Sequence, residues 1–328
     1  MKLLVLTSNP ERASFRQRLG VYVDVLAESG ISCEVTVLGG TLLQRSRQFA
    51  RAREYDGVFI HKKCFNPIDA RLLRRYAGKI IFNYDDAIMY KADRPMRPNL
   101  TRRLAFRRTA MLADMLLVGS EYLADQGRPH NNRIVVLPLG LEVLKYARKK
   151  EMDDGLVRLV WIGSASTVKY LQVILPAIIE VRRRVGNIVL RIVGDTFPDC
   201  GSVPVEERIW CQHRRFSDLA ECDIGLAPLP DDPFTQGKCS FKVLEYASSE
   251  LPVCASPVGT NRTYVVDGRT GFLAKDIEGW VNSLCTLAQN RQMRRAMGSA
   301  GRSLAEQFDV AVVGQRLAEV IKRTLQAS

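Results

Sequence analysis

Several common signatures are missing from this sequence of 328 residues. Its three histidines do not cluster with its eight cysteines, and no two cysteines form a C-x-x-C pair, which argues against a structural zinc site. We therefore expect free thiols in a reducing compartment, the cytoplasm. No G-x-G-x-x-G or G-x-x-x-x-G-K-[ST] motif is present, which argues against nicotinamide dehydrogenases and P-loop nucleotidases.

Long hydrophobic segments are missing as well. The longest apolar runs, such as residues 188–193, are far too short to span a bilayer. The apolar run at the N-terminus meets Asn9, Pro10 and charged residues too early for a signal peptide. We therefore expect residues 2–8 to form the first buried strand of the fold.

Charge is unevenly distributed along the chain. The overall composition, 46% apolar and 25% charged residues, is typical of a globular protein. Residues 1–150 contain 27 of the 48 basic and 14 of the 35 acidic residues, so they carry the whole net charge of +13. A basic half favours an anionic partner such as a membrane surface, a phosphorylated acceptor or nucleic acid. A solvated basic face without a partner is the alternative.

Short apolar runs alternate with helical patterns on both sides of a charged stretch, residues 145–155, which we predict to be a linker. This alternation predicts an α/β protein with a parallel, doubly wound sheet in each half. The expected domains are 1–148 and 149–328, and the last helix of the second can pack back on the first. Ligands of doubly wound sheets bind beyond the carboxyl ends of the strands, so residues at strand ends are candidates for function.

The first candidate site lies in residues 237–248, between a predicted strand and a helix that begins near Ser240. Backbone N–H groups at a helix start favour an anion, and Lys238 adds an ammonium group suited to a phosphate. Lys242 and Glu245 are three residues apart and share a helical face. Glu245 could accept hydrogen bonds from the two vicinal hydroxyls of a ribose. A surface Lys–Glu pair on an ordinary helix is the alternative.

A second strand end contains Gly163 and Ser164, with Lys169 near the start of the next helix. A glycine turn at this place can let a backbone N–H approach a phosphate. Many strand–helix turns contain Gly-Ser, so the signal by itself has low specificity.

Polar residues also follow strands of the first half. Asp85 and Asp86 end a predicted strand and could act as a general base or orient an acceptor hydroxyl, although Asp86 could equally cap a helix. His61 ends the neighbouring strand, where packing or hydrogen bonding is the alternative role. Arg16 and Arg18 lie in the first strand–helix loop, and one of them is expected near the acceptor.

Three basic helical stretches, residues 45–53, 71–79 and 102–108, intersperse arginine with apolar residues. This pattern favours a peripheral face on anionic lipid headgroups. A specific nucleic-acid partner is not expected, because no recognised module or aromatic platform accompanies the charge.

The run FKVLEYASSELPVCASPVGTNRTYVVDGRTGFLA, residues 241–274, resembles the donor-binding core of retaining group 1 (GT4-like) glycosyltransferases with the GT-B fold. Residues 14–30, 118–127 and 134–142 are similar to first-domain segments of the same family. The resemblance implies two Rossmann-like domains that face each other across a cleft. It also implies that Glu245 binds the ribose of a nucleotide sugar.

Two departures from the family pattern stand out. A first glutamate eight positions before Glu245 is replaced by Gly237, so an acidic contact to the donor sugar is missing. Ser164 stands where the phosphate motif that begins at Gly163 has arginine, while Lys169 keeps its lysine. Lys238 could supply the lost cation.

The resemblance leads to the expectation of a hexosyl- or related glycosyltransferase of EC class 2.4. Such an enzyme transfers a sugar, with retention and without a metal ion or other cofactor, to a saccharide or lipid-linked acceptor of the cell envelope. Asp86, or else Asp85 or His61, would position or deprotonate the acceptor hydroxyl, and the protein would be cytoplasmic or peripheral to the inner membrane face. The alternatives are a non-catalytic homologue that binds a nucleotide or an anionic partner, and a GT-B-fold epimerase or phosphorylase.

Overall fold

Apolar strands that are buried on both faces form the centre of each half of the chain. In the computed structural model, which describes residues 1–327, they assemble into two six-stranded sheets with parallel pairing throughout. The predicted α/β fold with two doubly wound sheets is therefore confirmed.

The chain divides into two units that are each assembled from separate segments. Unit 1 consists of Met1–Leu141, Asp232–Cys239 and the residues from Phe308 onward. Unit 2 consists of Glu142–Asp231 and Ser240–Gln307. A segment between two elements of unit 2 and the last helix of the chain thus both belong to unit 1.

The sheet of unit 1 has the strand order β2-β1-β3-β4-β5-β6. Its strands are β1 (Lys2–Thr7), β2 (Ser32–Val37), β3 (Gly57–His61), β4 (Ile80–Tyr84), β5 (Met115–Val118) and β6 (Ile134–Val136). Its α-helices are α1 (Ala13–Arg18), α2 (Val23–Glu28), α3 (Leu42–Ala50), α4 (Pro67–Tyr76), α5 (Leu100–Leu112), α6 (Glu121–Gly127) and α13 (Val310–Gln326). The order reverses between β1 and β3, which is the switch point where such sheets place ligands.

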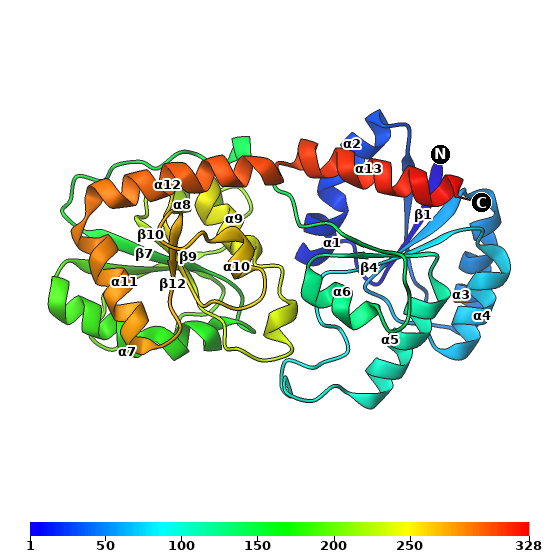
Figure 1. Cartoon of the computed structure of the whole chain (residues 1–328), viewed down its shortest axis with the longest axis horizontal. Helices are drawn as coiled ribbons and strands as arrows, with labels where there is room; N and C mark the ends of the chain where they lie inside the picture. The colour runs from blue at the N-terminus through cyan, green and yellow to red at the C-terminus, as the bar shows by residue number, and fades with distance from the viewer. Residues whose placement is uncertain (328) are drawn as a thin grey trace. The chain divides into compact units, whose positions relative to one another are not determined.

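The sheet of unit 2 has the order β12-β11-β10-β7-β8-β9, with its switch point between β7 and β10. Its strands are β7 (Val157–Ile162), β8 (Ile188–Gly194), β9 (Val205–Ile209), β10 (Ile224–Ala227), β11 (Val253–Ala255) and β12 (Gly271–Leu273). Its α-helices are α7 (Val168–Val185), α8 (Arg215–Ala220), α9 (Phe241–Ser248), α10 (Asn261–Tyr264), α11 (Ile277–Gln289) and α12 (Arg291–Ala305). Helices α7 and α11 pack together, as do α9 and α12, and Figure 1 shows these pairs on opposite faces of the sheet.

Short 3-10 helices complete the fold: η1 (Gly20–Tyr22), η2 (Arg51–Glu54), η3 (Val143–Lys145), η4 (Thr235–Gly237) and η5 (Glu306–Phe308). One of them interrupts residues 18–30, whose sequence pattern, ending at Gly30, predicts a single helix. The structure instead has α1, η1 and α2 in succession, with Leu19 outside helical geometry and Gly20, a poor helix former, beside it.

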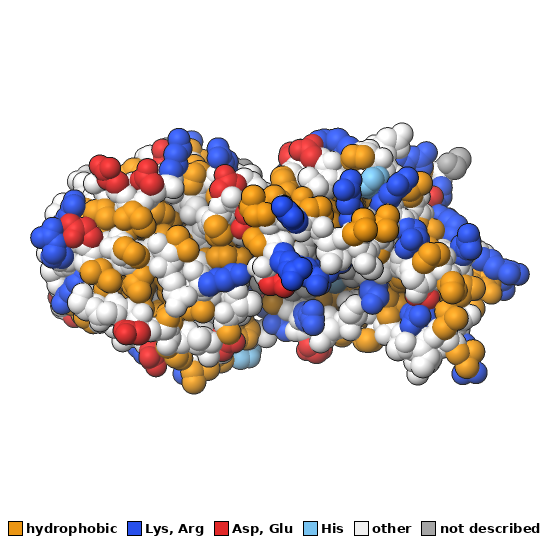
Figure 2. Space-filling view, turned by 90° about the horizontal axis from the view of Figure 1, so that it is seen from below, with side chains coloured by type: hydrophobic (Ala, Val, Ile, Leu, Met, Phe, Trp, Pro, Cys, Tyr) orange, Lys and Arg blue, Asp and Glu red, His pale blue; other side chains and the backbone are white. Residues whose placement is uncertain are grey.

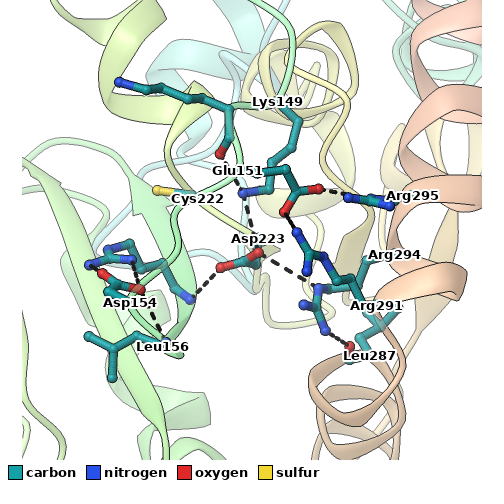
Figure 3. A network of polar contacts seen from close by, with 12 residues as sticks. Lys149, Glu151, Asp154, Leu156, Cys222, Asp223, Leu287, Arg291, Arg294 and Arg295 are labelled. Carbon is teal, nitrogen blue, oxygen red and sulfur yellow. Dashed lines mark hydrogen bonds and ion pairs between the residues drawn. The ribbon is translucent and has the colours of Figure 1, made fainter.

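The predicted linker has no regular structure between η3 and β7, but it is tied firmly to unit 2. Glu151 pairs with Arg291 at 2.6 Å and with Arg295 at 2.8 Å, both on α12. Lys149 lies 3.3 Å from Asp223, which is 7% exposed and immediately precedes β10. Figure 3 shows these side chains converging between the linker and α12, where they line a cavity of about 250 Å³.

Helix α13 closes the core of unit 1. Its residues Val313, Leu317 and Ile321 are buried together with Leu3 and Phe59 of the sheet, and the helix packs on α2. All eight cysteines of the chain lie within the described residues and are free. Within residues 1–327, no helix is both long and apolar enough to cross a membrane.

Candidate functional site

Helix α9 is fixed at the switch point of unit 2 by a tyrosine. The Tyr246 hydroxyl accepts a hydrogen bond from the backbone N–H of Ile162 on β7 at 2.9 Å and donates to the carbonyl of Leu226 on β10 at 3.2 Å. Gly225 makes room for this ring, because a Cβ there would lie 2.4 Å from it. The preceding residue, Glu245, is thereby held in a fixed position beside the two central strands.

Glu245 is 5% exposed, and its carboxylate has two polar neighbours from other parts of unit 2. The Tyr146 hydroxyl donates to Glu245 Oε1 at 2.8 Å, and Arg215 Nη1 lies 3.8 Å from the same oxygen. Burial raises the pKa of Glu245, while Arg215, Tyr146 and Lys242 act to lower it. The result is a buried carboxyl group with a defined orientation and spare acceptor capacity.

The start of α9 contains two further predicted donor residues. Ser240 precedes the helix with a left-handed backbone (φ 45°), and its buried hydroxyl has no hydrogen-bond partner within the described residues. The Lys242 ammonium lies 4.6 Å from the centre of the Trp161 ring at the end of β7. A serine hydroxyl and a lysine therefore lie at the start of the helix that carries Glu245.

The loop after β7 places Gly163, Ser164 and Lys169 differently from the prediction. The backbone N–H of Gly163 donates to Val193 at 3.1 Å, and that of Ser164 donates to the Thr167 hydroxyl at 3.1 Å. These N–H groups are therefore engaged within the protein and do not form an open phosphate cradle. Lys169 is exposed in the first turn of α7, with its ammonium 5.4 Å from the Tyr170 ring.

The predicted acidic residues of unit 1 form an ion-pair cluster with two lysines. Lys62 Nζ lies 2.9 Å from Asp85 and also contacts Asp86, and Lys238 Nζ lies 3.1 Å from Asp86. Lys62 adopts a left-handed backbone (φ 54°), a conformation rarely kept by residues other than glycine. Burial acts to raise the pKa of Asp86, but the two ammonium groups outweigh it and lower the pKa.

This geometry bears on the catalytic prediction. A carboxylate between two ammonium groups is a weak proton acceptor, so Asp86 is better suited to orienting a hydroxyl than to deprotonating it. Lys238, predicted to meet a phosphate, is part of this cluster in unit 1, whereas the other predicted donor residues lie in unit 2.

His61 lies at the end of β3 in a buried environment. It is 4% exposed, its Nδ1 is 3.3 Å from Asn83 Oδ1, and its ring meets Phe15 edge-on. Burial lowers the pKa of His61 to about 4. The side chain is therefore neutral near pH 7 and fits the packing and hydrogen-bonding role that was the alternative at this position.

The two arginines of the first loop have different environments. Arg18 is 2% exposed, and its Nη1 donates to the carbonyls of Leu137 at 2.5 Å and Pro138 at 3.4 Å. Its Nε and Nη2 have no hydrogen-bond partner within the described residues. Arg16 instead contacts the carbonyl of Glu11 near the surface.

Gly237, where the family pattern has glutamate, is closed off sterically. A Cβ at this position would lie 2.6 Å from the Cβ of Ala87 and 2.7 Å from its backbone nitrogen. A glutamate therefore does not fit without moving the backbone. The close packing of Gly237 against Ala87 excludes an acidic side chain at this position.

Sequence reasoning missed Tyr146, Arg215 and Trp161 as neighbours of the predicted residues. Tyr146 lies in the stretch predicted as a linker, and Arg215 follows a loop without a recognisable pattern. Among residues 1–327, no group of three or more His, Cys, Asp and Glu side chains could hold a metal ion.

Comparison with known proteins bears on the family and the fold of the chain. Residues 157–290 match the family model described as glycosyl transferases group 1. No curated protein sequence matches the chain. Sucrose-phosphate synthase from Thermosynechococcus elongatus is similar in structure, with a TM-score of 0.78 and 13% sequence identity over 100% of each chain. A glycosyltransferase from Rickettsia africae has a TM-score of 0.75 and 12% identity, covering 100% of this chain and 99% of that one. HepE from Anabaena, in complex with UDP and glucose, has a TM-score of 0.72 and 16% identity, covering 98% of this chain and 99% of that one.

At this low sequence identity the structural likenesses establish the fold, and the family model covers the domain that contains Glu245. The chain therefore has the GT-B fold, and its residues 157–290 match the group 1 glycosyl transferase family.

Proposed function

We propose that this enzyme transfers a sugar from a nucleotide-sugar donor, bound by unit 2, to a hydroxyl group of a saccharide or lipid-linked acceptor. The donor domain would be 149–328 and the acceptor-side domain 1–148. The observation that carries the proposal is the Glu245 carboxylate, buried and oriented by Tyr146 and Arg215 beside the switch point of the sheet.

The roles proposed for the side chains follow from their chemistry. Glu245 accepts hydrogen bonds from the two ribose hydroxyls, since a carboxylate offers about four lone-pair positions and Tyr146 occupies one. The Ser240 hydroxyl and the Lys242 ammonium meet the diphosphate at the start of α9. Positive charge there stabilises the leaving diphosphate as the bond to the sugar breaks.

The ligands of similar solved structures agree with a uridine nucleotide as donor. HepE from Anabaena was solved in complex with UDP-glucose, and a pneumococcal O-GlcNAc transferase was solved in complex with UDP and GlcNAc. We propose retention of configuration without a metal ion, with Asp86 orienting the acceptor hydroxyl.

The first test is thermal unfolding of the whole chain with UDP-, GDP-, TDP- and ADP-sugars, with and without divalent metal ions. A ligand at 100 times its Kd should stabilise the protein by about 2.7 kcal/mol. We expect a metal-independent stabilisation by one nucleotide that is lost in Glu245→Ala.

Glu278→Ala is the matched control, because Glu278 is an exposed glutamate in the first turn of α11. This variant should keep the full stabilisation. Binding that survives in Glu245→Ala would remove the proposed ribose contact. Donor binding without any sugar transfer would favour a non-catalytic homologue, and turnover without an acceptor would favour an epimerase.

We also propose that the basic first domain contacts an anionic membrane. The excess of +13 charges within residues 1–150 supports this contact.

A further inference from the structure

The three basic helical stretches of the first domain differ in how their arginines are used. On α3 and α4, Arg45 pairs with Asp69 at 3.0 Å and Arg74 pairs with Asp114 at 2.8 Å. Arg51, directly after α3, pairs with Glu34 at 2.7 Å. Several arginines of these two stretches are therefore already paired with acidic residues of unit 1.

Helix α5 presents a different surface. Leu100, Leu104, Arg107 and Met111 follow the spacing i, i+4, i+7, i+11 and therefore form one stripe along the helix. Leu100, Leu104 and Met111 are 70%, 48% and 60% exposed. Phe106, Thr109 and Ala110, on another side of the helix, are buried in unit 1. The exposed stripe is thus a second apolar face that the fold does not use.

Arginines surround this stripe. Residues 91–111 contain seven basic residues and a single acidic one. Five of these arginines are exposed and take part in no ion pair within residues 1–327: Arg94, Arg97, Arg102, Arg103 and Arg107. Arg102 donates to the carbonyl of Tyr90 at 2.8 Å, whereas the other four have no such side-chain hydrogen bond within these residues. Met96, in the segment before α5, is 67% exposed. Figure 2 shows Lys and Arg side chains among hydrophobic ones on the face of unit 1 that is turned to the viewer, with fewer acidic ones.

We propose that the α5 surface docks on anionic lipid headgroups. This surface consists of the apolar side chains Met96, Leu100, Leu104 and Met111 and the four arginines Arg94, Arg97, Arg103 and Arg107. The leucines and methionines enter the boundary between headgroups and acyl chains, and the arginines pair with the anionic headgroups.

Charge complementarity selects this occupant. A strongly basic rim matches a surface of a single negative sign, and each arginine near such a surface adds to the attraction. Sites for single-stranded nucleic acid typically have exposed aromatic rings on which the bases stack. The exposed apolar side chains of the α5 surface are instead all leucine or methionine. A partner that offers only charge would leave these four side chains in water.

The inference deepens the proposed function. It rests on that function for the identity of the lipid-linked acceptor, but the contact itself stands on the α5 surface alone. Docking there would bring the acceptor-side domain to the place where a lipid-linked acceptor resides.

The test is co-sedimentation of the whole chain with vesicles of phosphatidylcholine alone and with 30% phosphatidylglycerol added, a composition of our choosing at about 0.1 M salt. We expect binding only to the anionic vesicles. The double variants Arg103→Gln/Arg107→Gln and Leu100→Ser/Leu104→Ser should each weaken it by about 10-fold or more.

Two matched controls remove similar groups elsewhere on unit 1. Arg47→Gln/Arg71→Gln removes two exposed arginines from α3 and α4, and Leu42→Ser/Leu43→Ser removes two exposed leucines from α3. Both should bind vesicles much more strongly than the α5 variants. Equal losses in controls and α5 variants would overturn the assignment, as would absence of vesicle binding or tighter binding of the wild type to single-stranded DNA than to vesicles.

Donor-induced thermal stabilisation, measured on the same variants, separates this inference from the proposed function. The α5 variants should keep the stabilisation and the wild-type melting temperature. Vesicle binding without donor stabilisation would contradict the proposed donor, whereas donor stabilisation without vesicle binding would contradict the α5 surface.

Discussion

Tyr146 lies 99 positions before Glu245 in the chain, yet its hydroxyl donates to the Glu245 carboxylate at 2.8 Å. Burial raises the pKa of Tyr146 well above its ordinary value, so the hydroxyl stays a donor at any working pH. This bond holds the carboxylate in one orientation before any ligand arrives. Such preorganisation reduces the entropy that binding would otherwise cost.

His61 gives a pH dependence that belongs to a single residue. The unfolded chain protonates this histidine below about pH 6.5, whereas burial lowers the pKa of His61 to about 4 in the folded protein. Between these values the unfolded state binds more protons. The free energy of unfolding should therefore fall by up to about 3 kcal/mol as the pH drops from 6.5 to 4.

Urea unfolding of wild type and His61→Gln at several pH values measures this contribution. The free energy of unfolding of His61→Gln should depend less steeply on pH between 4 and 6.5 than that of the wild type. Above pH 6.5 the contribution of His61 to this free energy should be constant. His213→Gln, at an exposed position in the loop before α8, controls for replacing a histidine. Identical slopes in wild type and His61→Gln would show that His61 is not the titrating group.

At the scale of elements, the linker between β6 and β7 is held by two kinds of ion pair, which Figure 3 shows side by side. Asp223 is 7% exposed and accepts from the backbone N–H of Arg158 at 2.8 Å while it faces Lys149 and Arg294. Glu151, by contrast, pairs with two arginines that are more than half exposed. Buried pairs are costly to break from one side, and exposed pairs contribute little.

Asp223→Ala should therefore lower the free energy of unfolding by about 3 kcal/mol, because Lys149 and Arg294 are left without their counter-charge in a mostly buried place. Glu151→Ala, which removes only exposed pairs, should lower it by less than about 1 kcal/mol. Chemical denaturation of both variants provides the measurement. Equal effects would mean that the Asp223 network does not anchor the linker.

The sequence predicted most elements because their signals are local. The alternation of buried strands and amphipathic helices predicted the α/β fold class and the succession of strands and helices along much of the chain. The long apolar runs of β7 and β8 are typical of central parallel strands. Helices α11 and α12 were not assigned, and the break between α1 and α2 was missed. The break lies at Leu19, whose backbone leaves helical geometry, beside Gly20, a poor helix former.

The candidate site was predicted less completely, for a related reason. Lys242 and Glu245 were accessible to sequence reasoning because they lie three residues apart on one helix. Tyr146 and Arg215 reach Glu245 from distant segments, and no local pattern records that contact. The interactions of Asp86 with two lysines likewise depend on the fold, which is why its lowered pKa could not be foreseen.

At the scale of the whole molecule, the last helix determines whether the first domain can exist by itself. Val313, Leu317 and Ile321 of α13 are at most 1% exposed, so a fragment 1–148 lacks three core side chains. Their burial is worth about 5–9 kcal/mol, which is comparable to the stability of a domain. The fragment should therefore lack a cooperative thermal transition.

Calorimetry of fragment 1–148 and of the same fragment joined through a Gly/Ser linker to residues 308–328 tests this expectation. The joined version should regain a cooperative transition at least in part. A cooperative transition in fragment 1–148 alone would show that α13 is dispensable for folding.

The segmental assembly of the two units has a further consequence for exchanging parts between related enzymes. Because the chain leaves and re-enters unit 1 at residues 232–239 and again after Gln307, a hybrid joined at one point inherits mismatched surfaces at two others. Gly237 and Ala87 illustrate the problem, since a parent that carries a larger residue at position 237 would collide with this backbone. Functional hybrids should therefore exchange three segments together, and natural recombination at a single junction should be disfavoured.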